Sequence, residues 1–262
     1  MAATNLLELD SLEILVIVDN ELDPISPSPN PAVEQTGGMR TIAINGPTPT
    51  DRAGAARELR MDHICCSAHG LSLLITGVKD GKQHTVLFDT GPEEHAFERN
   101  SNRLRADIGK VEVIQLSHWH RDHSGGMLKA IPMIHEARKD TANSSLPLVQ
   151  VDLHPARPLY RGNQPPGMPV VSLEADPTFE QIEGTGVTLL KTDQAHTVCE
   201  HYFLVSGEIP RNTDYERGIR FGMRCDNLGE GWKTDEKIAD ERFLMCKLKG
   251  TGVSSHSHVL PS

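Results

Sequence analysis

The stretch His-Trp-His-Arg-Asp-His at residues 118–123 decides the fold, because four of its six side chains are common metal ligands. It follows the apolar run Val111–Leu116, whose length and β-branched content predict a buried strand. After it come Gly125 and Gly126, which permit close backbone approach before a further helix. The sequence therefore predicts a strand, a ligand-bearing loop and a helix at this point.

The spacing of the motif divides its ligands into two pairs. In an extended segment, residues i and i+2 point the same way, so His118 and His120 can bind one ion together. Asp122 and His123 are consecutive, so they face different directions and can serve a second ion beside the first. Imidazole together with carboxylate suits zinc, iron or manganese. We therefore expect one or two divalent ions, zinc or a similar metal, at these four residues.

Such a pair of ions suits hydrolytic chemistry. An open coordination position holds a water whose pKa falls to about 7, which provides hydroxide at neutral pH. Asp122 is then expected to be the catalytic residue, both a ligand and a proton acceptor. The alternative is a polar loop rich in histidine, since the chain has 13 histidines. An HxHxDH pattern at the end of an apolar strand arises by chance far less often than one histidine pair, and metal binding is favoured.

Charge and composition exclude several classes of partner. The chain has 36 acidic and 26 basic residues, a net charge of −10. A nucleic-acid or anionic-membrane binder needs a basic face, so neither partner is expected. No apolar run approaches the ~20 residues of a membrane helix, and Met1–Asp10 lacks a secretory signal pattern. Five cysteines without a CxxC pair indicate free thiols in a reducing cytoplasm. The oligomeric state stays open.

Strands dominate the rest of the chain, with single helices between them, and no internal repeat occurs. Strands are expected over Leu12–Val18, Leu71–Thr76, Thr85–Phe88, Val111–Leu116, Leu148–Leu153, Val170–Leu173, Val187–Lys191, Tyr202–Ser206 and Phe243–Leu248. Helices are expected over Asp51–Met61, over Pro92–Asp107 with Gly109 ending it, and from Gly125 onward. The pattern predicts one α/β (α+β) domain over residues 1–262.

Two segments are expected to lie outside this regular structure. Residues 21–50 contain six prolines and a Gly-Gly pair, which predict a long surface loop. Residues 249–262 are polar and lack apolar residues that would anchor them, so they predict a disordered tail.

The HxHxDH segment resembles the signature of the metallo-β-lactamase superfamily. Phe88-Asp89-Thr90-Gly91 supports this resemblance, because in that superfamily a strand ending in an Asp-Thr-Gly-like turn precedes the histidine motif. The resemblance implies an αββα sandwich. It also implies that Asp89, 29 residues before His118, orients the metal loop from behind the ligands. An ordinary turn residue is the alternative for Asp89.

A narrower resemblance runs from about Leu12 to Leu248. The chain is similar to a subfamily commonly labelled as similar to dihydropterin-methyl-ribofuranosylaminobenzene-phosphate synthase. The matching segments are His69–Ile75, Ser117–Gly126, His154-Pro155 and Ser206–Arg211 followed by Glu216. The chain departs from the subfamily at Ala68, where a glutamate is usual. The reaction in that label is not transferred to this chain.

His154 and Arg211 are candidate substrate contacts. Pro210 cannot continue a central strand, so the chain leaves the sheet there and places Arg211 on a loop. Its guanidinium could bind a carboxylate or phosphate, and the alternative is a surface ion pair with Glu208 or Glu216. His154 follows an expected strand, where loops build sites, and the alternative is a polar strand end.

The resemblance implies two further histidines, and the chain departs from the pattern there. In the subfamily these lie in a Cys-Ser-His-Ala-Gly segment and, tens of residues later, a Gly-Gly-Phe-His-Leu segment. Here residues 249–262 read KGTGVSSHSHVLPS, so His256 or His258 is a candidate third ligand. His196 and His201 are alternatives, although polar residues flanking a strand explain both. The second half of the sandwich is therefore expected to be incomplete, with each ion short of a ligand.

Two functions follow as expectations. The first is a metal-dependent hydrolase whose metal-bound hydroxide attacks a small-molecule ester, lactone, lactam or phosphoester. The second is a non-catalytic, metal-poor member of the fold that acts as a binding module, because the last histidine is missing. The fold does not fix the substrate, so the choice within the first class stays open.

Overall fold

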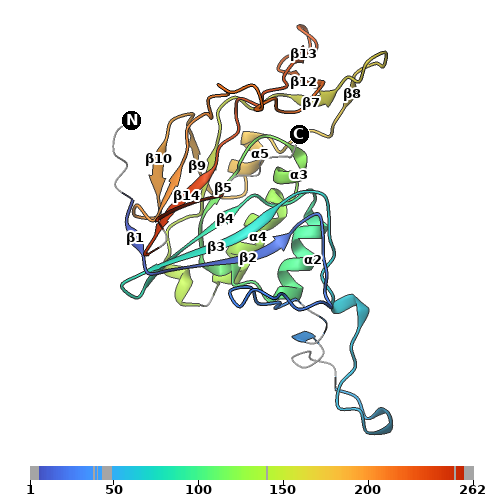
Figure 1. Ribbon diagram of the computed structural model, residues 1–262, viewed down its shortest axis with the longest axis vertical. Helices are drawn as coiled ribbons and strands as arrows, with labels where there is room; N and C mark the ends of the chain where they lie inside the picture. The colour runs from blue at the N-terminus through green and yellow to red at the C-terminus, as the bar shows by residue number, and fades with distance from the viewer. Residues whose placement is uncertain are drawn as a thin grey trace.

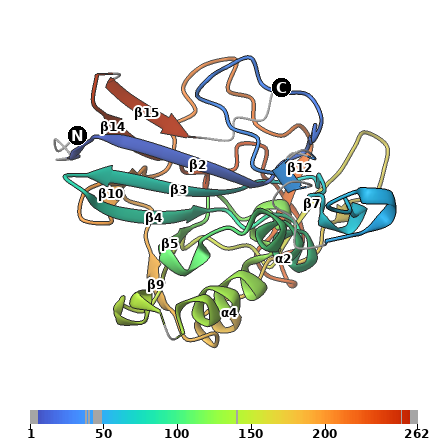
Figure 2. The same ribbon diagram turned by 90° about the horizontal axis from the view of Figure 1, so that it is seen from below.

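The computed structural model describes residues 6–37, 39, 41–42, 49–139, 141–250 and 252–256. Two large β-sheets lie face to face, and helices cover the outer face of the first (Figures 1 and 2).

The first sheet has six strands in the order β2-β3-β4-β5-β6-β9. Their bounds are Ser11–Val18, Ser72–Lys79, Lys82–Phe88, Val111–Gln115, Gln150–Leu153 and Thr188–Lys191. Strands β2, β3 and β4 run antiparallel, whereas β4, β5, β6 and β9 run parallel. The carboxyl ends of the parallel strands therefore meet at one edge, where such sheets commonly bind ligands.

Three helices cover the outer face of this sheet: α2 (Glu94–Leu104), α4 (Met127–Arg138) and α5 (Phe179–Glu183). Each presents apolar side chains to the strands. The fully buried Phe97 and Ile131 pack there with Leu87 and Trp119 in one apolar cluster. This burial fixes the helices on the sheet, and burying such a side chain stabilises by about 1.5–3 kcal/mol.

The second sheet has the order β1-β14-β11-β10, with β15 also paired to β14. The bounds are Glu8–Leu9, Leu244–Leu248, Phe203–Val205, His196–Val198 and Gly252–His256. Leu9, Phe88, Phe203 and Cys246 are buried between the two sheets in a second apolar cluster. Asp10 alone separates β1 from β2, so the first strands of the chain join the two sheets.

A small sheet lies beyond the edge formed by the carboxyl ends of the parallel strands (Figure 1). Its order is β13-β12-β7-β8, with bounds Lys233–Thr234, Gly222–Cys225, Tyr160–Asn163 and Val171–Ser172. These segments pass over the loop that carries the histidine motif.

The structure confirms the mixed α/β class. The described residues supply a helical layer and two sheets, so three of the four layers of an αββα sandwich are present among them. All nine expected strands form, within a few residues at each end.

Several local expectations were wrong. Asp51–Met61 forms no α-helix; only the 3₁₀ turns Arg52–Gly54 and Met61–His63 occur there. Helix α2 ends at Arg105 rather than Gly109, because Arg105 adopts the left-handed conformation that closes a helix. In the tail, Gly252–His256 forms β15 against β14 instead of a disordered segment.

Residues 21–37 form turns and bends, as expected for a surface loop, and most of residues 38–48 lie outside the described residues. All five cysteines carry free thiols. None of the helices that the structure describes has the length and apolar character needed to cross a bilayer.

Candidate metal centre

The motif residues lie at the carboxyl ends of the parallel strands. His118 and His120 belong to the loop after β5, and His120 has extended backbone angles. The one-turn helix α3 (Arg121–Ser124) then carries Asp122 and His123. The change from this bent loop to a helix turns the second pair of side chains back beside the first.

The four side chains meet as two adjacent pairs. Nε2 of His118 lies 2.8 Å from Nδ1 of His120. Oδ2 of Asp122 lies 3.4 Å from Nε2 of His123. The rings of His118 and His123 are 4.4 Å apart between centroids, which places the pairs side by side. The four side chains therefore lie together, and their division between two ions stays a prediction.

Asp89 holds the motif from the end of β4. Its buried carboxylate accepts hydrogen bonds from Nδ1 of His123 at 2.6 Å and from the backbone N–H and the hydroxyl of Ser117, both at 2.7 Å. The Ser117 hydroxyl lies 2.9 Å from Nδ1 of His118. Asp89 thereby orients one histidine directly and another through Ser117.

Two buried charges hold the backbone between the first two histidines. The N–H of Trp119 donates to Oδ2 of Asp240 at 2.7 Å, and the Trp119 carbonyl accepts from Arg161. Arg161 also forms ion pairs with Asp240 and Asp235. Since Arg161 and Asp240 are almost fully buried, they fix the loop where it bends.

Two glycines allow the chain to approach the motif closely. A Cβ atom on Gly70, whose φ is +131°, would lie 2.1 Å from the Asp122 carbonyl oxygen. A Cβ on Gly126 would lie 2.2 Å from the Thr90 carbonyl oxygen. No other residue fits at either position without displacing the backbone. Next to Gly70, Nε2 of His69 lies 3.4 Å from Oδ2 of Asp122.

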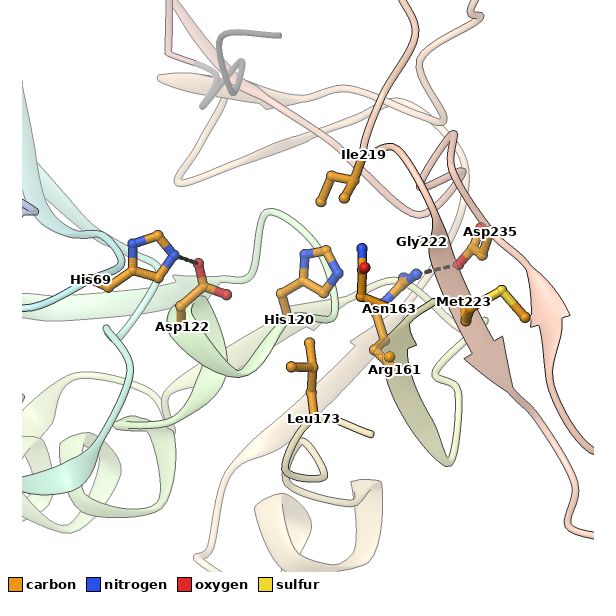
Figure 3. Close-up of a pocket in the computed structure, with 11 residues that line it drawn as sticks. His69, His120, Asp122, Arg161, Asn163, Leu173, Ile219, Gly222, Met223 and Asp235 are labelled. Atoms are coloured by element: carbon orange, nitrogen blue, oxygen red, sulfur yellow. Dashed lines mark hydrogen bonds and ion pairs between the residues drawn. The ribbon is translucent and has the colours of Figure 1, made fainter. Parts of the chain in front are cut away.

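A cavity of about 160 Å³ opens onto one residue from each of the two pairs (Figure 3). His120 and Asp122 line it, and Figure 3 shows Ile219 and Leu173 on opposite sides of His120. Its other lining residues are His69, Arg161, Gly162, Asn163, Gly222, Met223 and Asp235. Three of the lining side chains are apolar and six are polar or charged, so the cavity offers both kinds of contact to a small molecule.

Burial controls the charge of the histidines. Burial, with Arg161 nearby, lowers the pKa of His120 to about 4, so this imidazole is neutral at pH 7. A neutral imidazole is the form that binds a metal. Burial alone would also lower the pKa of His123, but the Asp89 carboxylate outweighs it and raises that pKa. A raised pKa would make metal binding at His123 more dependent on pH.

The two candidate substrate contacts lie in other surroundings. His154 is buried, its Nε2 is 3.3 Å from Oε1 of Glu208, and its carbonyl accepts from the Trp119 indole. It does not line the cavity of Figure 3. Arg211 pairs with Glu241, neither with Glu208 nor with Glu216 as the alternative had it. A substrate anion at Arg211 would have to displace this pair, so substrate binding by His154 and Arg211 stays a prediction.

The candidate third ligands lie in different surroundings from one another. Nε2 of His196 lies 2.5 Å from Oδ2 of Asp152, and Arg242 donates to the same carboxylate. In the β10–β11 turn, Nδ1 of His201 lies within hydrogen-bond distance, 2.8 Å, of the hydroxyl of Thr197 in β10. The backbone of His256 pairs with Leu244 in β15, and His258 lies outside the described residues.

Sequence reasoning missed His69, Arg161 and Asp240. His69 has a signal, because the chain resembles the subfamily at His69–Ile75, although that resemblance assigned it no role. Arg161 and Asp240 have no such signal, because a single charged residue in a short strand or turn is normally predicted to be exposed at the surface. Only the fold carries them to Trp119, 42 and 121 residues away in sequence.

Comparisons with known proteins give a partial picture. No family model matches the chain. Over 61 residues, 23% of this chain and 21% of the other, it is 38% identical to the 7,8-dihydropterin-6-methyl-4-(β-D-ribofuranosyl)-aminobenzene-5′-phosphate synthase of Methanocaldococcus jannaschii. The chain thus matches about a fifth of that relative's length.

The chain resembles metallo-β-lactamase-fold proteins. Similar solved structures include a Cronobacter sakazakii metallo-β-lactamase (TM-score 0.37, 11% identity, 72% of this chain). Others are the metallo-β-lactamase fold protein YhfI of Bacillus subtilis (0.37, 12%, 81%) and a quorum-quenching N-acyl homoserine lactone lactonase (0.34, 12%, 70%). The match spans 58% of the length of each. The chemistry of the site depends on this chain's own residues.

Proposed function

We propose that the chain is a metal-dependent hydrolase of small molecules, with its metal centre at the HxHxDH motif. The observation that carries the proposal is the convergence of Nε2 of His118 on Nδ1 of His120, beside the Asp122–His123 pair. These two nitrogens, from residues i and i+2, meet across a bend at residues 117–119, where the His120 N–H donates to the His118 carbonyl at 3.0 Å. The Asp89 network turns the ligand nitrogens toward this point.

The donor set fits a zinc-like ion. Imidazole nitrogen and carboxylate oxygen are ligands that zinc accepts, and each histidine ring of this set has a hydrogen bond or ring contact that defines its orientation. His118 and His120 would hold one ion, and Asp122 and His123 a second. A divalent ion bound there supplies a Lewis acid and lowers the pKa of a bound water to about 7.

The protein's own residues have distinct tasks. Asp122 faces the cavity and lies within 3.4 Å of His69 and of His123, so its second oxygen can take up a proton. Leu173, Ile219 and Met223 exclude water from part of the cavity and contact the apolar part of a substrate. Asn163 and Arg161 supply amide and cationic groups on the same wall. This combination suits a small ester, lactone, lactam or phosphoester.

A binding module without turnover is the second candidate. Among the described residues, the motif gives each ion two ligands, and a catalytic zinc usually has three. Loose metal binding and no turnover would follow if no further ligand completes the set.

The test is hydrolysis by the full chain loaded with zinc. Suitable probes are an N-acyl homoserine lactone, a chromogenic cephalosporin, a 4-nitrophenyl ester and bis(4-nitrophenyl) phosphate. We expect turnover of at least one class and a loss of roughly 10²–10⁴-fold in Asp122→Asn. The matched control is Asp214→Asn, an exposed aspartate outside the site. Zinc bound at the motif without turnover of any probe would favour the binding module.

A further inference from the structure

A second cluster of ligand side chains lies at the opposite end of the first sheet from the motif. It consists of His84 near the start of β4, Glu112 near the start of β5 and Cys199 in the β10–β11 turn. One ligand atom from each lies within 4.8 Å of the other two. Because Cys199 comes from the second sheet, the cluster spans the space between the two sheets.

His84 is the buried centre of this cluster, with 5% of its surface exposed. Its Nδ1 lies 2.8 and 3.0 Å from the two carboxylate oxygens of Glu112. Its Nε2 is buried and has no hydrogen-bond partner among the described residues, although a Glu200 oxygen lies 3.7 Å away. A buried imidazole nitrogen without a hydrogen bond is costly, and it is available to a ligand.

The turn that carries the thiol adopts an unusual backbone. Cys199, Glu200 and His201 are consecutive non-glycine residues with φ values of 51°, 51° and 69°. Left-handed conformation is unfavourable for such residues, so the surrounding structure must enforce it. The turn places the Cys199 thiol among His84, Glu112 and Glu200.

The electrostatics of the cluster favour a cation. Burial, together with Glu112 and Glu200, raises the pKa of the Cys199 thiol above its usual range. The thiol is therefore neutral when these groups are alone. Two carboxylates lie near it, and one of them, Glu200, pairs with Lys82. A divalent ion would offset these negative charges and convert the thiol into a thiolate ligand.

We propose that His84, Glu112 and Cys199 form a second metal site, which binds zinc or an ion of similar softness and ties the two sheets together. Nitrogen, oxygen and sulfur donors in one site suit zinc and disfavour calcium and magnesium. On binding, the S–H bond breaks, its proton goes to solvent, and the thiolate sulfur coordinates the ion. The site stabilises the fold and does not depend on the hydrolase proposal, because it shares no residue with the motif.

Cobalt(II) titration of the full chain tests this proposal. A thiolate ligand gives cobalt(II) an intense charge-transfer band in the near ultraviolet, and the HxHxDH motif has no sulfur ligand. We expect the band in the wild-type chain and its displacement by zinc. The variants Cys199→Ser, His84→Gln and Glu112→Gln should lose it. Cys246→Ser is the matched control, since Cys246 is buried in the same inter-sheet core, and it should keep the band.

Each outcome of the titration decides the proposal. If the wild-type chain shows no such band, the proposal is overturned without the need for any variant. A band that persists in Cys199→Ser overturns it too, because another thiol then supplies the sulfur. Loss in Cys199→Ser and Glu112→Gln, with near-ultraviolet circular dichroism unchanged and the control retaining the band, supports it. Zinc should also raise the Tm of the wild-type chain more than that of Cys199→Ser.

Discussion

Nδ1 of His123 lies 2.6 Å from Oδ2 of Asp89, although 34 residues separate them in sequence. Both side chains are almost fully buried, and Asp89 adopts a left-handed backbone with φ of 57° at the end of β4. A strained residue with a fully satisfied carboxylate is typical of a functional position. This contact links the turn after β4 to the motif after β5.

Removal of the Asp89 carboxylate should weaken the metal centre. In Asp89→Ala, His123 loses its orienting partner and Ser117 loses two hydrogen bonds, so metal affinity should fall roughly 10–100-fold. Competition with a chromophoric chelator measures this affinity. Asp214→Asn is the control for a changed net charge. Unchanged metal retention in Asp89→Ala would count against the supporting role.

The contacts of Asp240 and Arg161 with the Trp119 backbone should contribute to the free energy of unfolding. Asp240→Ala leaves the Arg161 guanidinium buried with one carboxylate fewer, and it leaves the Trp119 N–H without its acceptor. Breaking one partner of a buried pair costs about 3–5 kcal/mol of unfolding free energy. Urea unfolding, monitored by tryptophan fluorescence, measures the change. A loss below about 1 kcal/mol would show that these contacts are not needed to hold the loop.

His196 gives a pH-dependent contribution of predictable sign. Its hydrogen bond to Asp152 raises its pKa above the unfolded value of about 6.5. The contribution to stability is therefore complete below that unfolded value, and it is lost as the pH rises through the higher folded pKa. The difference in unfolding free energy between wild type and His196→Gln should be larger at about pH 6 than at about pH 9.

The control for this prediction is His95→Gln, which changes an exposed histidine on α2. It should leave the pH dependence of unfolding as in the wild type. A difference for His196→Gln that grows as the pH rises would reverse the sign and contradict the assignment of the Asp152 contact.

The tail offers a separate prediction. A chain ending at Gly252 loses β15, and the edge of β14 (Leu244–Leu248) loses its backbone hydrogen bonds. We expect a loss of about 1–3 kcal/mol in unfolding free energy. Zinc stoichiometry and hydrolytic rate should stay the same, because the expectation from the sequence is an idle tail. A clear loss of zinc in the truncated chain, or in His256→Ala or His258→Ala, would show that a tail histidine is a ligand.

Much of the first sheet could be predicted from the sequence because its signals are local. Apolar runs such as Leu12–Val18 and Val111–Leu116 predict strands by their length and β-branched content, and the Asp80-Gly81 turn fixes a hairpin. The short strands β7, β10, β12 and β13 carry no such pattern. They form because backbone groups find partners brought near by the fold.

The candidate site divides in the same way. The i and i+2 spacing of His118 and His120 predicts that they lie together in an extended segment. In the structure a bend at residues 117–119, closed by a hydrogen bond from the His120 N–H to the His118 carbonyl, brings them together instead. The charged residues that fix this loop, Arg161 and Asp240, depend on how distant segments pack, and so does the assembly of the His84 cluster. Arg211 shows why local sequence predicts such contacts poorly. Its partner Glu241 is 30 residues away, whereas the sequence suggested the nearby Glu208 or Glu216.

The central claim is that the HxHxDH motif binds metal, and anomalous scattering from a zinc-soaked crystal of the full chain tests it most directly. Data collected on both sides of the zinc absorption edge locate zinc atoms without any assumption about ligands. We predict a peak between Nε2 of His118 and Nδ1 of His120, with zinc–nitrogen distances of about 2.0–2.1 Å. Zinc found elsewhere in the chain, with no peak within bonding distance of any of the four motif residues, would contradict the account.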